Sequence, residues 1–254
     1  MEQTRFCTAK FLAAFLAFTL IIAGAPRAAH ATPDWGGIWI RVGGISWDPT
    51  LKPGQFDRPP LTPPYQARYQ AALDALEAGH PVNDPTAACQ PPGAVRLMNM
   101  VYPMEIFQRP GLVAVFAEWD HQVRRIYTDG RKPDPDLDRS YNGYSTGHWE
   151  GDELVAETVK LQPYPVITAS GLTLGKSVTM SERWKQTGPD TLTDTITLTD
   201  PESLTRPYTV VKSFRRAPPG FEIMEYTCTE NNRNPVLEDG TTGTVLNKSF
   251  PKAD

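Results

Sequence analysis

Ionisable residues recur on the apolar faces of several predicted strands, and this placement is the main indication of chemistry in the chain. The residues that share it are Glu118, Arg125, Glu182, Asp194, Lys212 and Glu225. Each continues a row of apolar residues spaced two apart, which is the spacing that puts side chains on one face of a pleated strand. Because an unpaired buried charge is costly, these groups must pair, meet water or shift their pKa.

Two interpretations of these inward charges remain open. In the first, they form acid–base pairs and hydrogen bonds at the ends of a barrel and have a structural role. In the second, they line a polar, partly wet lumen that orients a ligand or holds a carboxylate poised as a general base. Glu118, Glu182 and Glu225 are then the candidate bases, with Arg125 or Tyr127 stabilising the developing negative charge.

Other catalytic patterns are weak. His80, His121 and His148 have no HxH or HExxH spacing, which argues against a zinc site. Ser145 lies in the sequence GYSTG, which matches the pattern of a nucleophile elbow. That motif needs a strand, a turn and a helix, whereas a strand is expected to follow here. We therefore expect no metal and no cofactor.

The stretch GYSTGHWEGDELVAET, residues 143–158, predicts a β-hairpin that positions several of these groups. Gly151 supplies the positive φ that a tight turn needs. After the turn, Leu154 and Thr158 point to one face of the strand, and Glu157 points to the other.

From residue 96 onward, short predicted strands are separated by turns rich in Gly, Pro and Asp. The predicted strands are residues 97–107, 112–119, 122–128, 144–149, 153–160, 176–184, 191–199, 208–215 and 221–228. Strands of this length and spacing indicate a mostly β domain over residues 96–230. We expect an antiparallel meander that closes into a barrel-like, lipocalin-like domain, with a sandwich as the alternative. Residues 231–254 are expected to form a polar, irregular tail.

Residues 32–95 predict a Pro-, Gly- and Trp-rich arm, a helix and a loop. Trp35, Trp39 and Trp47 are too apolar for a free tail, so we expect them to pack against the body of the protein. Residues 36–40 could add one short strand.

A single N-terminal helix is expected over residues 62–79. Thr62 is the candidate N-cap, prolines occupy the first turn, and Gly79 ends the helix. The apolar residues that share one face are Tyr65, Tyr69, Leu73 and Leu76.

The N-terminus predicts export. Residues 11–25 form an apolar run after a short basic region, and an Ala-x-Ala pattern ends at Ala31, so we expect a signal peptide over residues 1–31. Export favours a disulfide between Cys89 and Cys228, with a metal pair or a reactive thiol as the alternative. The net charge of −4 and the absence of a basic run argue against a nucleic-acid partner and, after cleavage, against a membrane partner.

The segments RRIYTDGRKPDPD, GYSTGHWEGDELVAET, SERW and EYTCTENN resemble the signature blocks of a large family of exported bacterial proteins. Its members carry a W-E-G-D-x-L-V-x-E-T hairpin after a Y-x-D-G-R turn, and the match covers residues 89–231. The resemblance implies export and the β fold but no reaction, because most of the family is uncharacterised. The site candidates that it adds are Arg125, Tyr127, Trp149, Glu150, Glu157, Glu182 and Glu225.

The chain departs from the family pattern at Tyr144 and Thr146, which could alter a ligand-facing loop that includes Ser145. Six Trp, nine Tyr and ten Phe could supply the walls of a pocket. We therefore predict an exported periplasmic or secreted barrel that binds a small hydrophobic or aromatic molecule, with Asp194 and Lys212 among its ligand contacts. The alternatives are a cofactor-independent lyase or isomerase that uses a lumenal Glu, and a structural or partner-binding envelope protein. The oligomeric state is left open.

Overall fold

The computed structural model describes residues 32–44, 46–52, 54–230, 236, 238 and 243–244. The predicted signal peptide lies outside the described residues, as does most of the predicted tail. The chain from Thr32 to Asp254 forms one compact unit. No helix among the described residues is long and apolar enough to cross a membrane.

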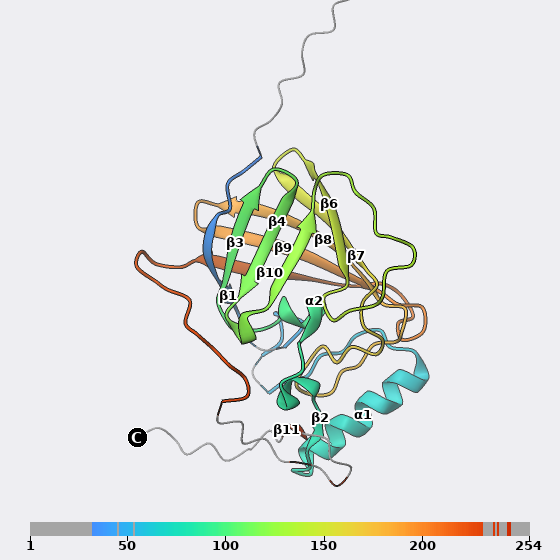
Figure 1. The fold of residues 1–254 in the computed structure, drawn as a ribbon. Coiled ribbons are helices and arrows are strands. Elements are labelled where there is room, and N and C mark those ends of the chain that lie inside the picture. The colour runs from blue at the N-terminus through green and yellow to red at the C-terminus, as the bar shows by residue number, and fades with distance from the viewer. Residues whose placement is uncertain are drawn as a thin grey trace, which may run out of the picture. The chain divides into compact units, whose positions relative to one another are not determined.

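The unit is built on a closed β-barrel (Figure 1). Its strands are β1 (Gly37–Val42), β3 (Met104–Arg109), β4 (Leu112–Ala117), β5 (Val123–Tyr127), β6 (Tyr144–Glu150), β7 (Glu153–Val159), β8 (Thr179–Gly188), β9 (Thr191–Thr199) and β10 (Tyr208–Arg216). Around the barrel the order is β1-β10-β9-β8-β7-β6-β5-β4-β3, and β3 pairs with β1. The predicted mostly β, barrel-like fold is confirmed.

Two connections differ from an antiparallel meander. The strands β5 and β6 run parallel, with Ile126 opposite Ser145. A hairpin cannot join parallel strands, so residues 128–143 must cross from one end of the barrel to the other. At the seam, β1 pairs antiparallel with both β10 and β3. The barrel is therefore closed by a strand from the predicted N-terminal arm.

Two of the predicted strands are wrong in part or in whole. Of residues 97–107, Leu97 ends the short helix α2 (Gly93–Leu97), and the strand begins only at Met104. Residues 221–228 form no strand. Once β1 occupies the seam, the barrel has no open edge with which this segment could pair.

Residues 221–228 are instead held by side chains of the turn between β4 and β5. The backbone N–H groups of Met224 and Cys228 donate to the carboxylates of Glu118 and Asp120, at 3.0 and 3.5 Å. The N–H of Tyr226 donates to His121 Nε2 at 3.4 Å. Alternate N–H groups thus find acceptors without a neighbouring strand, which explains why an extended pattern did not produce one.

The predicted helix is confirmed as α1 (Pro63–Glu77), which lies beyond one end of the barrel (Figure 1). Its buried residues are Tyr65, Tyr69 and Leu76, and Leu73 packs against the core. Thr62 does not cap the helix with its side chain, because its hydroxyl donates to Glu202 O at 2.9 Å.

Smaller elements complete the end of the barrel near α1. They are β2 (Val82–Asn83), which pairs with β11 (Gly243–Thr244), and the 3-10 turn η1 (Pro85–Ala88); a second such turn, η2 (Trp119–His121), follows β4. The expected packing of the arm is confirmed, since Trp35, Trp39 and Trp47 are all fully buried.

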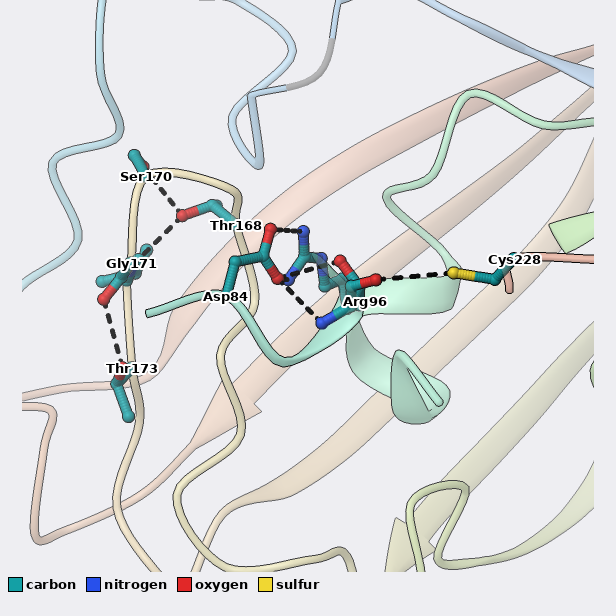
Figure 2. A network of polar contacts seen from close by, with 9 residues as sticks. Asp84, Arg96, Thr168, Ser170, Gly171, Thr173 and Cys228 are labelled. Atoms are coloured by element: carbon teal, nitrogen blue, oxygen red, sulfur yellow. Dashed lines mark hydrogen bonds and ion pairs between the residues drawn. The ribbon is translucent and has the colours of Figure 1, made fainter. Parts of the chain in front are cut away.

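The predicted disulfide joins Cys89 to Cys228, with Cα atoms 5.5 Å apart. Figure 2 shows the polar network beside it. Arg96 binds both carboxylate oxygens of Asp84, at 2.5 and 2.8 Å, and both side chains are buried. Asp84 also accepts from the N–H and hydroxyl of Thr86, whose carbonyl contacts the Cys228 sulfur. The disulfide therefore anchors the extended 221–228 segment beside this buried polar cluster.

Candidate functional site

A buried ion pair lies inside the barrel. The Arg124 Nη1 atom is 2.7 Å from Glu182 Oε1, and Nη2 contacts the second carboxylate oxygen. Arg124 also donates to the hydroxyls of Ser145 and Thr158, with Nη2 distances of 3.3 and 3.0 Å. The two charged side chains are 1% and 0% exposed. Both charges are compensated and shielded from solvent, which agrees with the first interpretation of the inward charges, a structural role.

Asp194 lies next to this pair and is fully buried. On β9 it is directly opposite Lys212 of β10, and Ile196, two residues along, is opposite Glu182 of β8. Neither carboxylate oxygen of Asp194 accepts a hydrogen bond from a described donor. Burial and the neighbouring Glu182 carboxylate raise the pKa of Asp194 well above its usual range. Burial and the adjacent carboxylate thus both favour the protonated form of Asp194 over its carboxylate.

Lys212 is also fully buried, but its ammonium group is well supplied with acceptors. Its Nζ donates to the carbonyls of Trp47 and Ser46 and to Asn99 Oδ1, the last at 2.7 Å. It also lies 4.7 Å from the Trp47 ring centroid. Burial and the nearby Arg41, opposed by the charge of Asp57, lower the pKa of Lys212 to about 7. Lys212 therefore fastens the N-terminal arm to the inside of the barrel.

The inward orientation expected of Glu182, Asp194 and Lys212 is thus correct, and that of three other residues is wrong. On β4 the buried residues are Val113, Val115 and Ala117, so Glu118 follows the outer face. On β5 the buried residues are Arg124 and Ile126, and Arg125 is exposed. Glu225 is exposed on the segment that forms no strand. A shift of one residue exchanges the two faces of a strand, and both faces of β4 are apolar, so the pattern did not fix the choice.

Of the remaining predicted residues, Ser145 faces the interior, where it binds Arg124. Trp149 packs on Trp35, with ring centroids 4.9 Å apart. Tyr127 and Tyr144 pack against each other on the outside of the barrel, with tilted rings whose centroids are 5.3 Å apart.

Two predicted carboxylates lie on the outer surface. Glu150 pairs with Arg183 at 2.7 Å, in an exposed ion pair. Glu157 lies on the outer face of β7. Partial desolvation there, and the negative charge of Glu182, both raise the pKa of Glu157. The structure therefore does not bring the predicted residues together around one cavity.

Two adjoining cavities lie elsewhere, between the arm, α1 and a loop near residue 169. The first, of about 530 Å³, is lined by Gly44, Ser46, Leu51, Lys52, Gly54, Gln55, Phe56, Asp57, Thr168, Ala169 and Ser170. The second, of about 940 Å³, is lined by Leu51, Gly54, Gln55, Phe56, Asp57 and Arg58 of the arm and by residues of α1 from Gln66 to Glu77. They share Leu51, Gly54, Gln55, Phe56 and Asp57, and none of the sequence-predicted site residues lines either.

Asp57 lines both cavities and is nearly fully buried. Its carboxylate accepts from the backbone N–H groups of Trp47 and Asp48, at 2.9 and 2.6 Å. Burial raises the pKa of Asp57, whereas these hydrogen bonds and the charge of Lys212 lower it. An acidic group is thus held in a fixed position where the two cavities meet.

Three hydroxyl groups form a chain among the residues that line the two cavities. Tyr69 Oη is 3.2 Å from Ser170 Oγ, which is 2.9 Å from Thr168 Oγ1. Thr168 Oγ1 also accepts from the N–H of Leu172 at 3.2 Å. Figure 2 shows Thr168 and Ser170 in the loop that carries them. Sequence reasoning missed this site, and the signal available was the concentration of Trp, Pro and Gly in the arm.

No group of three or more His, Cys, Asp or Glu residues in the described part of the chain could hold a metal ion. Comparison with protein-family models and with curated proteins finds no match to this chain.

Proposed function

We propose that the protein is an exported binder of a small hydrophobic or aromatic molecule, and that the ligand occupies the joined cavities at the end of the barrel. The supporting observation is the pair of adjoining cavities around residues 51–57. Their volumes, about 530 and 940 Å³, lie within the range of ligand sites in proteins. Leu51, Phe56 and Ala169 give the smaller cavity an apolar lining.

The interior of the barrel supports this placement. Large apolar residues from every part of the barrel meet there, including Trp39, Trp184 and Phe214. Among the charged residues there, Arg124 pairs with Glu182, and Lys212 donates to backbone carbonyls and to Asn99. Asp194 lies beside Glu182. The barrel interior therefore acts as a core on which the end cavities are built.

Export to the periplasm or beyond is part of the proposal. It rests on the basic and apolar pattern of residues 1–31 and on the disulfide, which persists in oxidising compartments.

Binding can be tested with Nile red, an uncharged fluorescent dye, titrated against the protein lacking residues 1–31. Ala169→Trp places a large side chain at the cavity wall, and we expect it to abolish binding. The matched control is Ala71→Trp, at an exposed position of α1 that lines neither cavity. Equal dye binding by the wild type and Ala169→Trp would contradict the proposed site.

A second candidate is proton transfer by Asp57, in place of the lumenal Glu first considered. The observation that favours it is a buried carboxyl group with a raised pKa in the cavity wall. Solvent deuterium incorporated into a bound carbon acid, measured by mass spectrometry, would support it. Asp57→Asn should then stop the exchange while leaving Nile red binding in place.

A further inference from the structure

The hydroxyl chain of Tyr69, Ser170 and Thr168 contains one more hydroxyl hydrogen than its internal hydrogen bonds use. Three hydroxyl hydrogens are available, and the two contacts between the hydroxyls use one hydrogen each. The hydrogen bond from Leu172 uses a lone pair of Thr168 and no hydroxyl hydrogen. In every arrangement of the chain, one O–H group is therefore left to donate elsewhere.

All three residues of the hydroxyl chain line the cavities. None of the three hydroxyls donates to any other described residue. Tyr69 lines the larger cavity, and Thr168 and Ser170 line the smaller one. Their side chains are more than nine-tenths buried, at 3%, 4% and 7% residual exposure. Since a buried donor without an acceptor is costly, this wall is complementary to a ligand that brings an acceptor.

The phenol keeps its hydrogen at physiological pH. Burial, opposed by the hydrogen bond with Ser170 and supported by the negative charge of Asp57, raises the pKa of Tyr69 to about 12. The chain therefore offers a hydrogen-bond donor, and no cation, to the ligand.

The charges around the cavities disfavour a negatively charged ligand. Asp57 lies at their junction, and Asp74 and Glu77 line the larger cavity. The lining cations are Lys52 and Arg58, so the acidic side chains outnumber them. A carboxylate ligand would bring a further negative charge close to a buried one.

We infer that the hydroxyl chain recognises a neutral carbonyl oxygen, so that the ligand is an uncharged apolar ketone or ester rather than a hydrocarbon or a fatty acid. This inference rests on the proposed function and specifies the chemistry of the same site. The apolar lining holds the body of the molecule, and the free hydroxyl hydrogen fixes the orientation of its carbonyl group.

Three fluorescent probes with one ring system can test it. They are 6-propionyl-2-(dimethylamino)naphthalene, its propyl counterpart without the carbonyl, and the corresponding 6-carboxylate. For each protein, the Kd of the propyl probe is divided by the Kd of the ketone. We expect this ratio to be about five- to tenfold larger for the wild type than for a protein without the hydroxyl chain. The carboxylate should bind more weakly than the ketone.

The decisive variant removes all three hydroxyls, as Tyr69→Phe with Ser170→Ala and Thr168→Val. Single variants of Tyr69 or Thr168 leave two hydroxyls with one contact, so each retains one free hydrogen and part of the preference. The control is Tyr65→Phe, one turn earlier on α1, whose hydroxyl donates to Glu202 at 2.7 Å. We expect this control to keep the full preference for the ketone.

The outcomes separate the two levels of the proposal. If the triple variant keeps the wild-type preference, or the carboxylate binds as tightly as the ketone, the inference is overturned and the binding site remains. If the wild type binds none of the probes and no Nile red, both fail. If the triple variant does not fold, the infrared carbonyl stretch of the ketone bound to wild type decides. A frequency lowered from its value in alkane supports the hydrogen bond, and an unchanged frequency refutes it.

Discussion

Asp194 and Lys212 lie directly opposite each other on neighbouring strands inside the barrel, yet they form no ion pair. The Lys212 ammonium group turns to the carbonyl of Trp47 and to Asn99. The Asp194 carboxyl group lies beside Glu182, and none of the described donors binds it. Opposite charges at facing positions would suggest a salt bridge. Here Lys212 instead binds acceptors of the N-terminal arm and Asn99, and Asp194 lies next to Glu182.

Asp194→Asn should stabilise the protein at neutral pH. A folded pKa raised above the unfolded value of about 3.9 means that the native state holds an extra proton, so stability falls as pH rises from about 4 towards the folded pKa. Asn resembles the protonated acid and has no such dependence. Urea unfolding at pH 4.5 and pH 8 should show the gain mainly at pH 8. Asp152→Asn, at an exposed turn, is the control, and a gain of equal size at both pH values would contradict the assignment.

Glu182→Gln should destabilise the barrel by about 3–5 kcal/mol, because it leaves the Arg124 guanidinium buried without a counter-charge. Glu157→Gln on the next strand provides a matched control with an exposed side chain, and its effect should stay within about 0.5 kcal/mol. Both values follow from urea denaturation at pH 7. The double variant Arg124→Leu with Glu182→Leu removes both charges and should be more stable than Glu182→Gln. If it were not, the stability lost in Glu182→Gln would not come from the unpaired Arg124 guanidinium.

Lys212 should give the protein the opposite pH dependence. Because burial lowers its pKa to about 7 from an unfolded value of about 10.4, the unfolded state binds more protons between these values. The cost of burying Lys212 is therefore complete below about pH 7 and is relieved as pH rises towards 10. The free energy of unfolding of wild type should rise relative to Lys212→Met between pH 7 and 9.5. Lys185→Met, whose side chain is exposed on β8, should show no such trend.

Loss of the Cys89–Cys228 disulfide should cost up to about 5 kcal/mol, since the crosslink spans 139 residues. Native-state strain or residual structure in the unfolded chain would reduce this figure. Reduction should also loosen Tyr226 from the Trp119 ring, which lies 4.9 Å away, and so change tryptophan fluorescence. A Cys89→Ser with Cys228→Ser variant should respond to reductant in neither assay. Two thiols alkylated without reductant would show that the bond does not form in the protein.

The sequence predicted the barrel well where the two faces of a strand differ. On β9, threonines alternate with Leu192, Asp194, Ile196 and Leu198, and the structure buries the second set. On β4 both faces are apolar, so the choice of face was wrong and Glu118 was assigned to the interior. The sequence therefore predicts the inward orientation of Glu182, Asp194 and Lys212 correctly. On β5 it points to Arg125, whereas the buried arginine is Arg124.

The cavities could not be predicted from periodicity. They are formed by an irregular arm, one face of α1 and a loop, and only the fold brings residues such as Phe56 and Ser170 to the same space. The sequence predicts only a possible short strand over residues 36–40, because so short a segment after a Pro- and Gly-rich start carries little evidence of its partners. The structure places the strand β1 at Gly37–Val42. It pairs with β3 and β10, which lie more than sixty residues away, and a local sequence pattern does not specify such distant partners.

The strand that closes the barrel also affects how the protein can be made. Because β1 must bond to β10 as well as β3, a growing polypeptide cannot complete the ring until residue 216 has been synthesised. Until then the flank of β1 that will receive β10 stays unpaired and open to other chains. Contacts between such distant segments form slowly. Nascent chains of this protein should therefore depend on chaperones that shield exposed strands until the last one arrives.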